Sequence, residues 1–221
     1  MAEEKYRWYI TKNEGVSLVP SDPNVRSLSN RLGWKADTLI ARVQKALPQK
    51  LEQDMFLHLT VDWRVPLHPE TFRSIYLYFT NGQWLSNHDL EDRKLGENIY
   101  SNKGEKIIDQ LSLTMNLLHW QKEQGYFIGW RTAAHLVQAY GEDAEDILSM
   151  IAESLDEIME ERRMKMSHRK AFAVIVKNVA DIAANGSKNC ALPNVSCVDD
   201  IITLLSSFAS SSTWEHNEEE E

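Results

Sequence analysis

Cysteine is scarce in this sequence of 221 residues, which contains only Cys190 and Cys197. The two are too far apart for a CxxC motif, and no histidine lies between them. This spacing argues against a paired-cysteine zinc site and against thiol–disulfide chemistry. We expect both residues to be free thiols in a reducing compartment.

Long hydrophobic runs are also missing. No stretch approaches the ~18–20 apolar residues that a membrane span needs. The N-terminal MAEEKYRWYI carries charge where a signal peptide would have its apolar stretch. The sequence therefore predicts a cytoplasmic protein with no transmembrane segment, although a nuclear location stays open.

Short catalytic motifs are a third absence. The chain has no GxSxG, no HExxH and no glycine-rich phosphate-binding loop. This lowers the expectation of an enzyme without excluding one. We expect no catalytic residues, no resident metal and no cofactor.

The N-terminal part contains patterns typical of β-strands. Residues 55–65 alternate apolar and polar side chains, and residues 74–79 alternate again. The pair Asn81-Gly82 favours a tight hairpin turn. These features predict an antiparallel meander through residues 55–86. Shorter strands are expected at 6–10 and 16–20.

Helical periodicity dominates the remainder of the chain. A short helix is expected to end near Gly33, and a second spans 35–47 before Pro48. Further helices are expected at 105–120, 129–140, 142–161, 170–184 and 196–209. The predicted fold is α+β and predominantly α, with a small antiparallel sheet in the N-terminal part. We divide the chain into a mixed part (1–100), a helical part (101–212) and a mobile acidic tail (213–221).

Residues 142–161 combine an acidic surface with an apolar seam. The seam residues recur at spacings of four and three: Ala144, Leu148, Ile151, Leu155 and Ile158. The apolar stripe of residues 172–183 points about 100° away from this seam on a helical wheel. One straight helix cannot bury both apolar stripes against the same core. We therefore predict a break near 166–168, with Ser167 as the cap of the second helix.

Positive charge is concentrated around this break, although the formal net charge of the chain is −9. The bases are Arg162, Arg163, Lys165, Arg169 and Lys170. Acids at the start of a helix and bases at its end match the helix dipole, and local ion pairs use two of the five bases. The surplus makes residues 162–170 a candidate site for a polyanion, an acidic partner or the chain's own acidic tail.

Aromatic residues form the second candidate surface. Trp120, Tyr126, Phe127 and Trp130 cluster around two glycines, and they are candidates for a protein interface, with Trp120, Tyr126 and Trp130 as the main ones. Packing between consecutive helices is the simpler explanation of the same cluster.

Carboxylates and histidines supply the remaining alternatives. Glu153 and Glu157 share one helical face, as in helical Mg²⁺-dependent hydrolases, but no matching ExxxE pair exists elsewhere. His58, Asp62 and His68 could form a metal or acid–base site on the predicted sheet, where an exposed polar face is the simpler reading.

These observations favour a non-catalytic protein–protein interaction or assembly protein, such as a component of a viral or regulatory assembly. Its expected partner is another protein or a second copy of the chain. Two alternatives stay open: an RNA- or anionic-lipid-binding protein acting through 162–170, and a metal-dependent hydrolase using the acidic helix 142–161.

Overall fold

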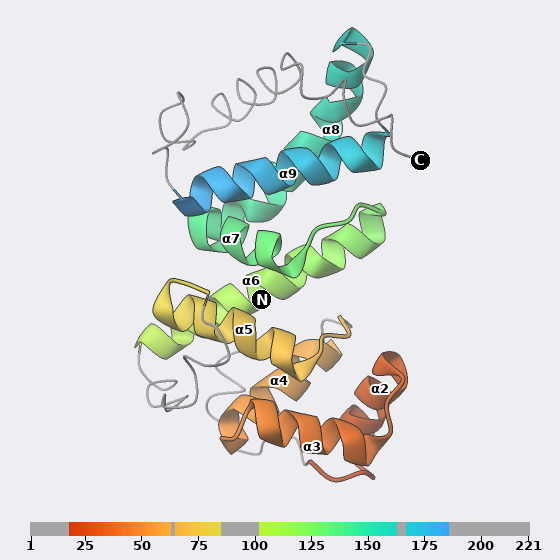
Figure 1. The fold of residues 1–221 in the computed structure, drawn as a ribbon, viewed down its shortest axis with the longest axis vertical. Helices are drawn as coiled ribbons and strands as arrows, with labels where there is room; N and C mark the ends of the chain where they lie inside the picture. The colour runs from red at the N-terminus through yellow and green to blue at the C-terminus, as the bar shows by residue number, and fades with distance from the viewer. Residues whose placement is uncertain (1–17, 63–64, 85–101, 163–166, 186–221) are drawn as a thin grey trace. The chain divides into compact units, whose positions relative to one another are not determined.

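The computed structural model describes residues 18–62, 65–84, 102–162 and 167–185, and all regular structure within these ranges is helical (Figure 1). The elements in chain order are α2 (Pro23–Leu32), α3 (Ala36–Ala46), α4 (Lys50–Asp62), α5 (Pro69–Asn81), α6 (Asn102–Gln124), α7 (Trp130–Tyr140), the 3-10 helix η2 (Gly141–Asp143), α8 (Ala144–Arg162) and α9 (His168–Asn185). No described helix is long and apolar enough to cross a bilayer.

The chain forms two compact units, Met1–His119 (unit 1) and Trp120–Glu221 (unit 2). In unit 1, α2 packs against α3 and α4, and α3 packs against α5. Phe56 of α4 meets Phe72 of α5 edge to face, with ring centroids 5.3 Å apart. The boundary expected near residue 100 adjoins residues 85–101, which lie outside the described residues, and it stays a prediction.

The predicted antiparallel sheet is wrong. Most of the first expected strand, 55–65, belongs to helix α4, and the described residues contain no strand. Side chains are buried from Glu52 to Leu57 and again at Leu59 and Thr60, so this helix is enclosed on nearly all sides. A helix that is buried all round has no polar face, and its apolar residues then satisfy an alternating pattern by chance.

The second expected strand, 74–79, lies within helix α5. Its alternating polar residues do not face away from a sheet. Instead, the side chain of Ser74 donates to the carbonyl of Glu70, one turn earlier, and Tyr76 and Tyr78 are buried. The informative signal was Pro69 at the first helical position.

The Asn81-Gly82 pair ends a helix and does not form a hairpin turn. Gly82 adopts φ 74°, and its N–H donates to the carbonyl of Tyr78. Glycine is the usual residue for this left-handed helix cap, as it is for hairpin turns. The same dipeptide therefore fits both structures, and only the flanking periodicity separates them.

The helices predicted at 35–47, 105–120, 129–140 and 170–184 are confirmed with small shifts of their ends. The helix expected before Gly33 is α2, whose first turn is capped by Asp22. The carboxylate of Asp22 accepts hydrogen bonds from the backbone N–H groups of Asn24 and Val25. The strand predicted at 16–20 is not formed in its described part, because residues 18–20 have no strand structure. The predicted strand at 6–10, the helix at 196–209 and the tail at 213–221 lie outside the described residues.

In unit 2, α7 and α8 both pack against α9 (Figure 1). The seam of α8 is confirmed, because Ala144, Leu148, Ile151 and Leu155 are buried. The predicted change of helix is also confirmed, since α8 ends at Arg162 and α9 begins at His168. Each helix can therefore turn its own apolar stripe inward. At the start of α9, the carbonyl of Ser167 accepts the first helical hydrogen bond, from Ala171.

Candidate binding surface at the start of helix α9

The connection between α6 and α7, residues 125–129, forms one side of the candidate surface. Gly125 ends α6 with φ 74°, a left-handed conformation that a side chain would strain. The backbone N–H of Ile128 donates to the Gln121 side chain, and the Ile128 side chain is buried. Phe127, between these anchored residues, is 72% exposed.

Beneath this connection lies a stack of aromatic rings. Tyr126 stacks on Phe172 of α9, with centroids 4.0 Å apart and planes 23° apart. Trp120 lies 6.0 Å from each of these two rings. Phe172 is fully buried, and Trp120, one of the predicted interface residues, is 8% exposed, so the stack lies inside unit 2. The stack gives the connection a firm support.

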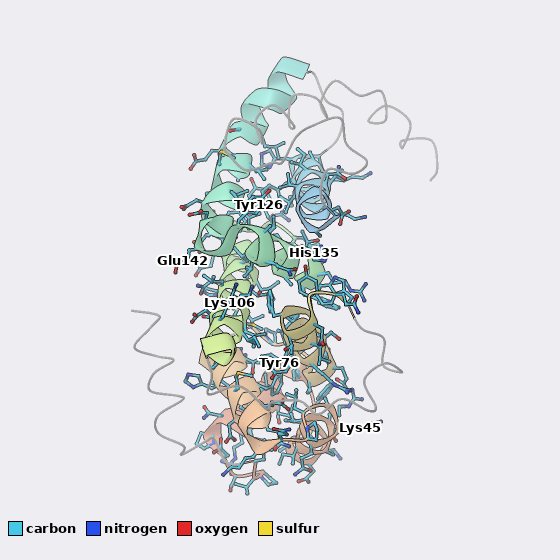
Figure 2. The ribbon with its side chains drawn as sticks, turned by 90° about the vertical axis from the view of Figure 1, so that its left-hand side faces the viewer. Lys45, Tyr76, Lys106, Tyr126, His135 and Glu142 are labelled. Atoms are coloured by element: carbon cyan, nitrogen blue, oxygen red, sulfur yellow. The ribbon has the colours of Figure 1, made fainter. Side chains whose placement is uncertain are left out.

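Polar contacts fix the first turn of α9 against the same connection. The Tyr126 hydroxyl lies 3.1 Å from Nδ1 of His168, and Figure 2 shows Tyr126 among the side chains of unit 2. A Cβ atom added to Gly125 would lie 3.4 Å from Nη2 of Arg169. The guanidinium of Arg169 therefore lies close to the backbone, two residues before Phe127.

The predicted basic residues are only partly within the described side chains. Arg169 and Lys170 are exposed in the first turn of α9. Arg162 is the last residue of α8, but its side chain, together with Arg163 and Lys165, lies outside the described residues. Two cations at the positive end of a helix dipole reinforce its potential, so this is an electropositive surface.

The third predicted aromatic residue, Trp130, is half-buried at the start of α7. Its neighbour Arg131 places Cζ 5.0 Å from the centroid of the Trp130 ring. This separation suits a cation–π contact.

Negative charge gathers at the opposite end of α8. The exposed acids are Glu142, Asp143, Glu145 and Asp146, and Figure 2 shows Glu142 at the edge of unit 2. The 19 residues of α8 span ~28 Å at 1.5 Å per residue. These four acids therefore lie far from the Arg162 end of α8, but the second half of the helix carries five more, Glu153, Asp156, Glu157, Glu160 and Glu161, so the positive potential is local to the start of α9.

The carboxylates and histidines proposed as alternative sites either lie on different elements or have side chains outside the described residues. Glu153 is exposed on α8, and the side chain of Glu157 lies outside the described residues. His58 is half-buried on α4, while His68 is exposed before α5, with its ring 4.9 Å from that of Trp34. Among the described residues, no group of three or more His, Cys, Asp or Glu could hold a metal ion.

Phe127 belongs to the aromatic cluster predicted as an interface, and its ring is exposed. Nothing in the sequence separates this exposed ring from the stacked rings of its neighbours. Glu52 was not singled out from the sequence: it lies between the predicted helix 35–47 and the predicted strand 55–65, and it is fully buried in unit 1. Its position beside Gln53 and Asp54 gave no sign of burial, because three consecutive polar residues normally face solvent.

No family model, curated protein or solved structure matches this chain. Function must therefore be inferred from the chemistry of these surfaces.

Proposed function

We propose that the chain is a non-catalytic binding protein that docks an acidic protein segment on the α9 surface, defined as Phe127, Arg169 and Lys170. The observation that carries this proposal is the exposure of Phe127 two residues from Gly125, which the exposed Arg169 guanidinium approaches, with exposed Lys170 following Arg169 in the helix. The partner would supply carboxylates for Arg169 and Lys170, and an apolar side chain to cover Phe127.

Phe127 supports the proposal because burying a Phe side chain is worth ~1.5–3 kcal/mol, a gain that this residue does not obtain within unit 2. The ring is not carried on a loosely held loop. Ile128 is buried on one side and Tyr126 is stacked on the other. A presented and preorganised aromatic side chain loses little conformational entropy when a partner covers it.

The charge of the surface favours an acidic partner. Arg169 and Lys170 follow each other in the first helical turn, where backbone N–H groups without helical partners add to the positive potential. A carboxylate placed there would gain charge-assisted hydrogen bonds from the Arg169 guanidinium.

A protein segment is favoured over RNA for electrostatic reasons. The chain has a formal net charge of −9. Exposed acids at the start of α8 limit the basic surface of unit 2 to the start of α9, so the unit has no extended basic face among its described residues. Nucleic-acid binding without sequence preference draws on many phosphate contacts, whereas a short acidic segment needs few.

The test is a fluorescence anisotropy titration of the full chain with a labelled peptide of nine glutamates and one tryptophan. Arg169→Gln with Lys170→Gln, and separately Phe127→Ala, should each weaken binding about tenfold, which corresponds to ~1.4 kcal/mol. Lys177→Gln is the matched control, because Lys177 is an exposed cation on the same helix. It should leave the affinity within twofold of wild type.

A second titration with a labelled ten-nucleotide uridine RNA separates the alternatives. Tighter binding of the RNA, with a salt dependence that the double variant reduces, would replace the acidic protein partner by RNA. If the wild-type chain binds neither probe, or if Lys177→Gln weakens binding as much as the double variant, the α9 surface is not the site.

A further inference from the structure

Unit 1 contains a carboxyl group in an unusual setting. Glu52, in the first turn of α4, is 0% exposed, and no described side chain donates a hydrogen bond to its carboxylate, although the backbone N–H of Gln49 acts on it. Most buried polar atoms have a hydrogen-bond partner, because water is no longer available to them. An ionised carboxylate would be especially costly in this position.

The nearest source of compensating charge is Arg73 of α5, next to Phe72 at the contact with α4. Its Nε is buried and lacks a hydrogen-bond partner, so the two side chains do not form a hydrogen-bonded pair through this atom. Burial raises the pKa of Glu52 from 4.5 to about 7. It outweighs two opposing influences, the backbone N–H of Gln49 and, to a smaller extent, the positive charge of Arg73.

Other charged groups around α4 act elsewhere. Arg31, on α2, donates from Nη2 to the carbonyl of Thr60, two turns beyond Glu52. Lys50 acts on Asp54, and Glu70 on α5 is exposed. Among the described residues, Arg73 is therefore the charged group whose interaction with Glu52 matters most.

We propose that Glu52 is a proton-operated switch in unit 1, which keeps the first turn of α4 packed while it is protonated and releases that turn when it ionises. The released carboxylate would reach water, and its departure would also uncover Arg73. This inference concerns unit 1 and is independent of the α9 surface.

Asp54 provides a built-in comparison. It is 4% exposed, and its Oδ1 lacks a partner. Burial also raises its pKa, from 3.8 to about 6, with the charge of Lys50 acting in the opposite direction. Because residues two apart point to different sides of a helix, Asp54 does not share the position of Glu52 beside Arg73.

The test is residue-resolved hydrogen exchange of the full chain between pH 5.5 and 8.5, corrected for the intrinsic pH dependence of exchange. In the wild type, amides 53–57 should lose protection about tenfold or more as the pH rises. Gln53 is informative because its N–H donates to the Gln49 carbonyl across this turn. Above pH 6.5, where the change in Asp54 is largely complete, the loss should disappear in Glu52→Gln, whereas Asp54→Asn should retain it.

A flat wild-type profile, or an equal loss in Glu52→Gln, would overturn the switch. Should Glu52→Gln fail to fold, the side-chain carboxyl resonance of Glu52 in the wild type gives the answer directly. A midpoint near 7 that coincides with the loss of amide protection supports the proposal. A midpoint near 4.5, or one unrelated to protection, contradicts it.

Discussion

The two units differ in which groups they bury: unit 1 buries carboxyl groups, whereas unit 2 exposes an aromatic side chain. Unit 1 encloses Glu52 and Asp54 without full hydrogen bonding, whereas unit 2 stacks aromatic rings inside and exposes Phe127 with its cations. A buried carboxyl couples the stability of a unit to pH. An exposed aromatic side chain beside cations leaves stability little affected and offers a binding surface. The contrast suggests that unit 1 responds to conditions and unit 2 to a partner.

The largest expected effect is the loss of the aromatic stack in unit 2. Phe172→Ala removes a fully buried ring that contacts Tyr126 and Trp120. It should lower the free energy of unfolding of unit 2 by ~3–5 kcal/mol, and Phe172→Leu should cost less. Urea denaturation followed by hydrogen exchange assigns the loss to a unit. A cost below ~1 kcal/mol would show that the stack is not a core.

The seam of α8 gives the next largest effect. Leu155→Ala should cost ~2–5 kcal/mol because Leu155 is fully buried. Glu153→Ala, two residues earlier and exposed, is the matched control and should stay within ~0.5 kcal/mol of wild type. Equal thermal melts for the two variants would refute the assignment of the packing face.

The third prediction concerns the pH dependence of the stability of unit 1. Glu52 has a higher pKa in the folded chain than in the unfolded chain, so the folded chain binds more protons between pH 4.5 and about 7. The free energy of unfolding of unit 1 must then fall as the pH rises through this window. At pH 8, Glu52→Gln should stabilise unit 1 by ~1–3 kcal/mol, and at pH 4 the gain should vanish.

Denaturation at these two pH values measures the effect. Destabilisation by Glu52→Gln at pH 8 would mean that the carboxylate is ionised and well compensated in the folded unit. Unit 2 should show no matching gain.

The smallest predicted effect is the cap of α2. Asp22→Ala removes the acceptor of the Asn24 and Val25 amides and should cost ~0.5–2 kcal/mol, whereas Asp22→Asn should cost only a few tenths. Chemical denaturation distinguishes the two. Equal losses for both variants would show that the charge of Asp22, and not its hydrogen bonds, stabilises the helix.

The sequence predicted the helices with a clear apolar stripe, including the change of direction between α8 and α9. It failed in α4, where a helix buried on nearly all sides imitates the alternation of a strand. It also failed at Gly82, because hairpin turns and helix ends favour the same residue. The two errors have different causes: periodicity identifies a helix only when the helix has a polar face, and a turn residue does not by itself say which structure it ends.

The candidate surface was only partly predictable. Arg169 and Lys170 are evident from charge alone, since a lysine or arginine is almost always exposed. The exposure of Phe127 depends on which of three consecutive large side chains the chain geometry turns inward. Likewise, the burial of Glu52 follows from the packing of α4 in unit 1, which no local pattern encodes.

The most direct test of the contrast is hydrogen exchange of the full chain under two perturbations, a rise from pH 5.5 to 8.5 and saturation with the acidic peptide. The pH change should reduce protection in the first turn of α4 and leave residues 125–129 and the start of α9 unchanged. The peptide should increase protection at 125–129 and the first turn of α9 and leave α4 unchanged. Protection of α4 by the peptide, or a matching response of both regions to pH, would contradict the division of roles between the two units.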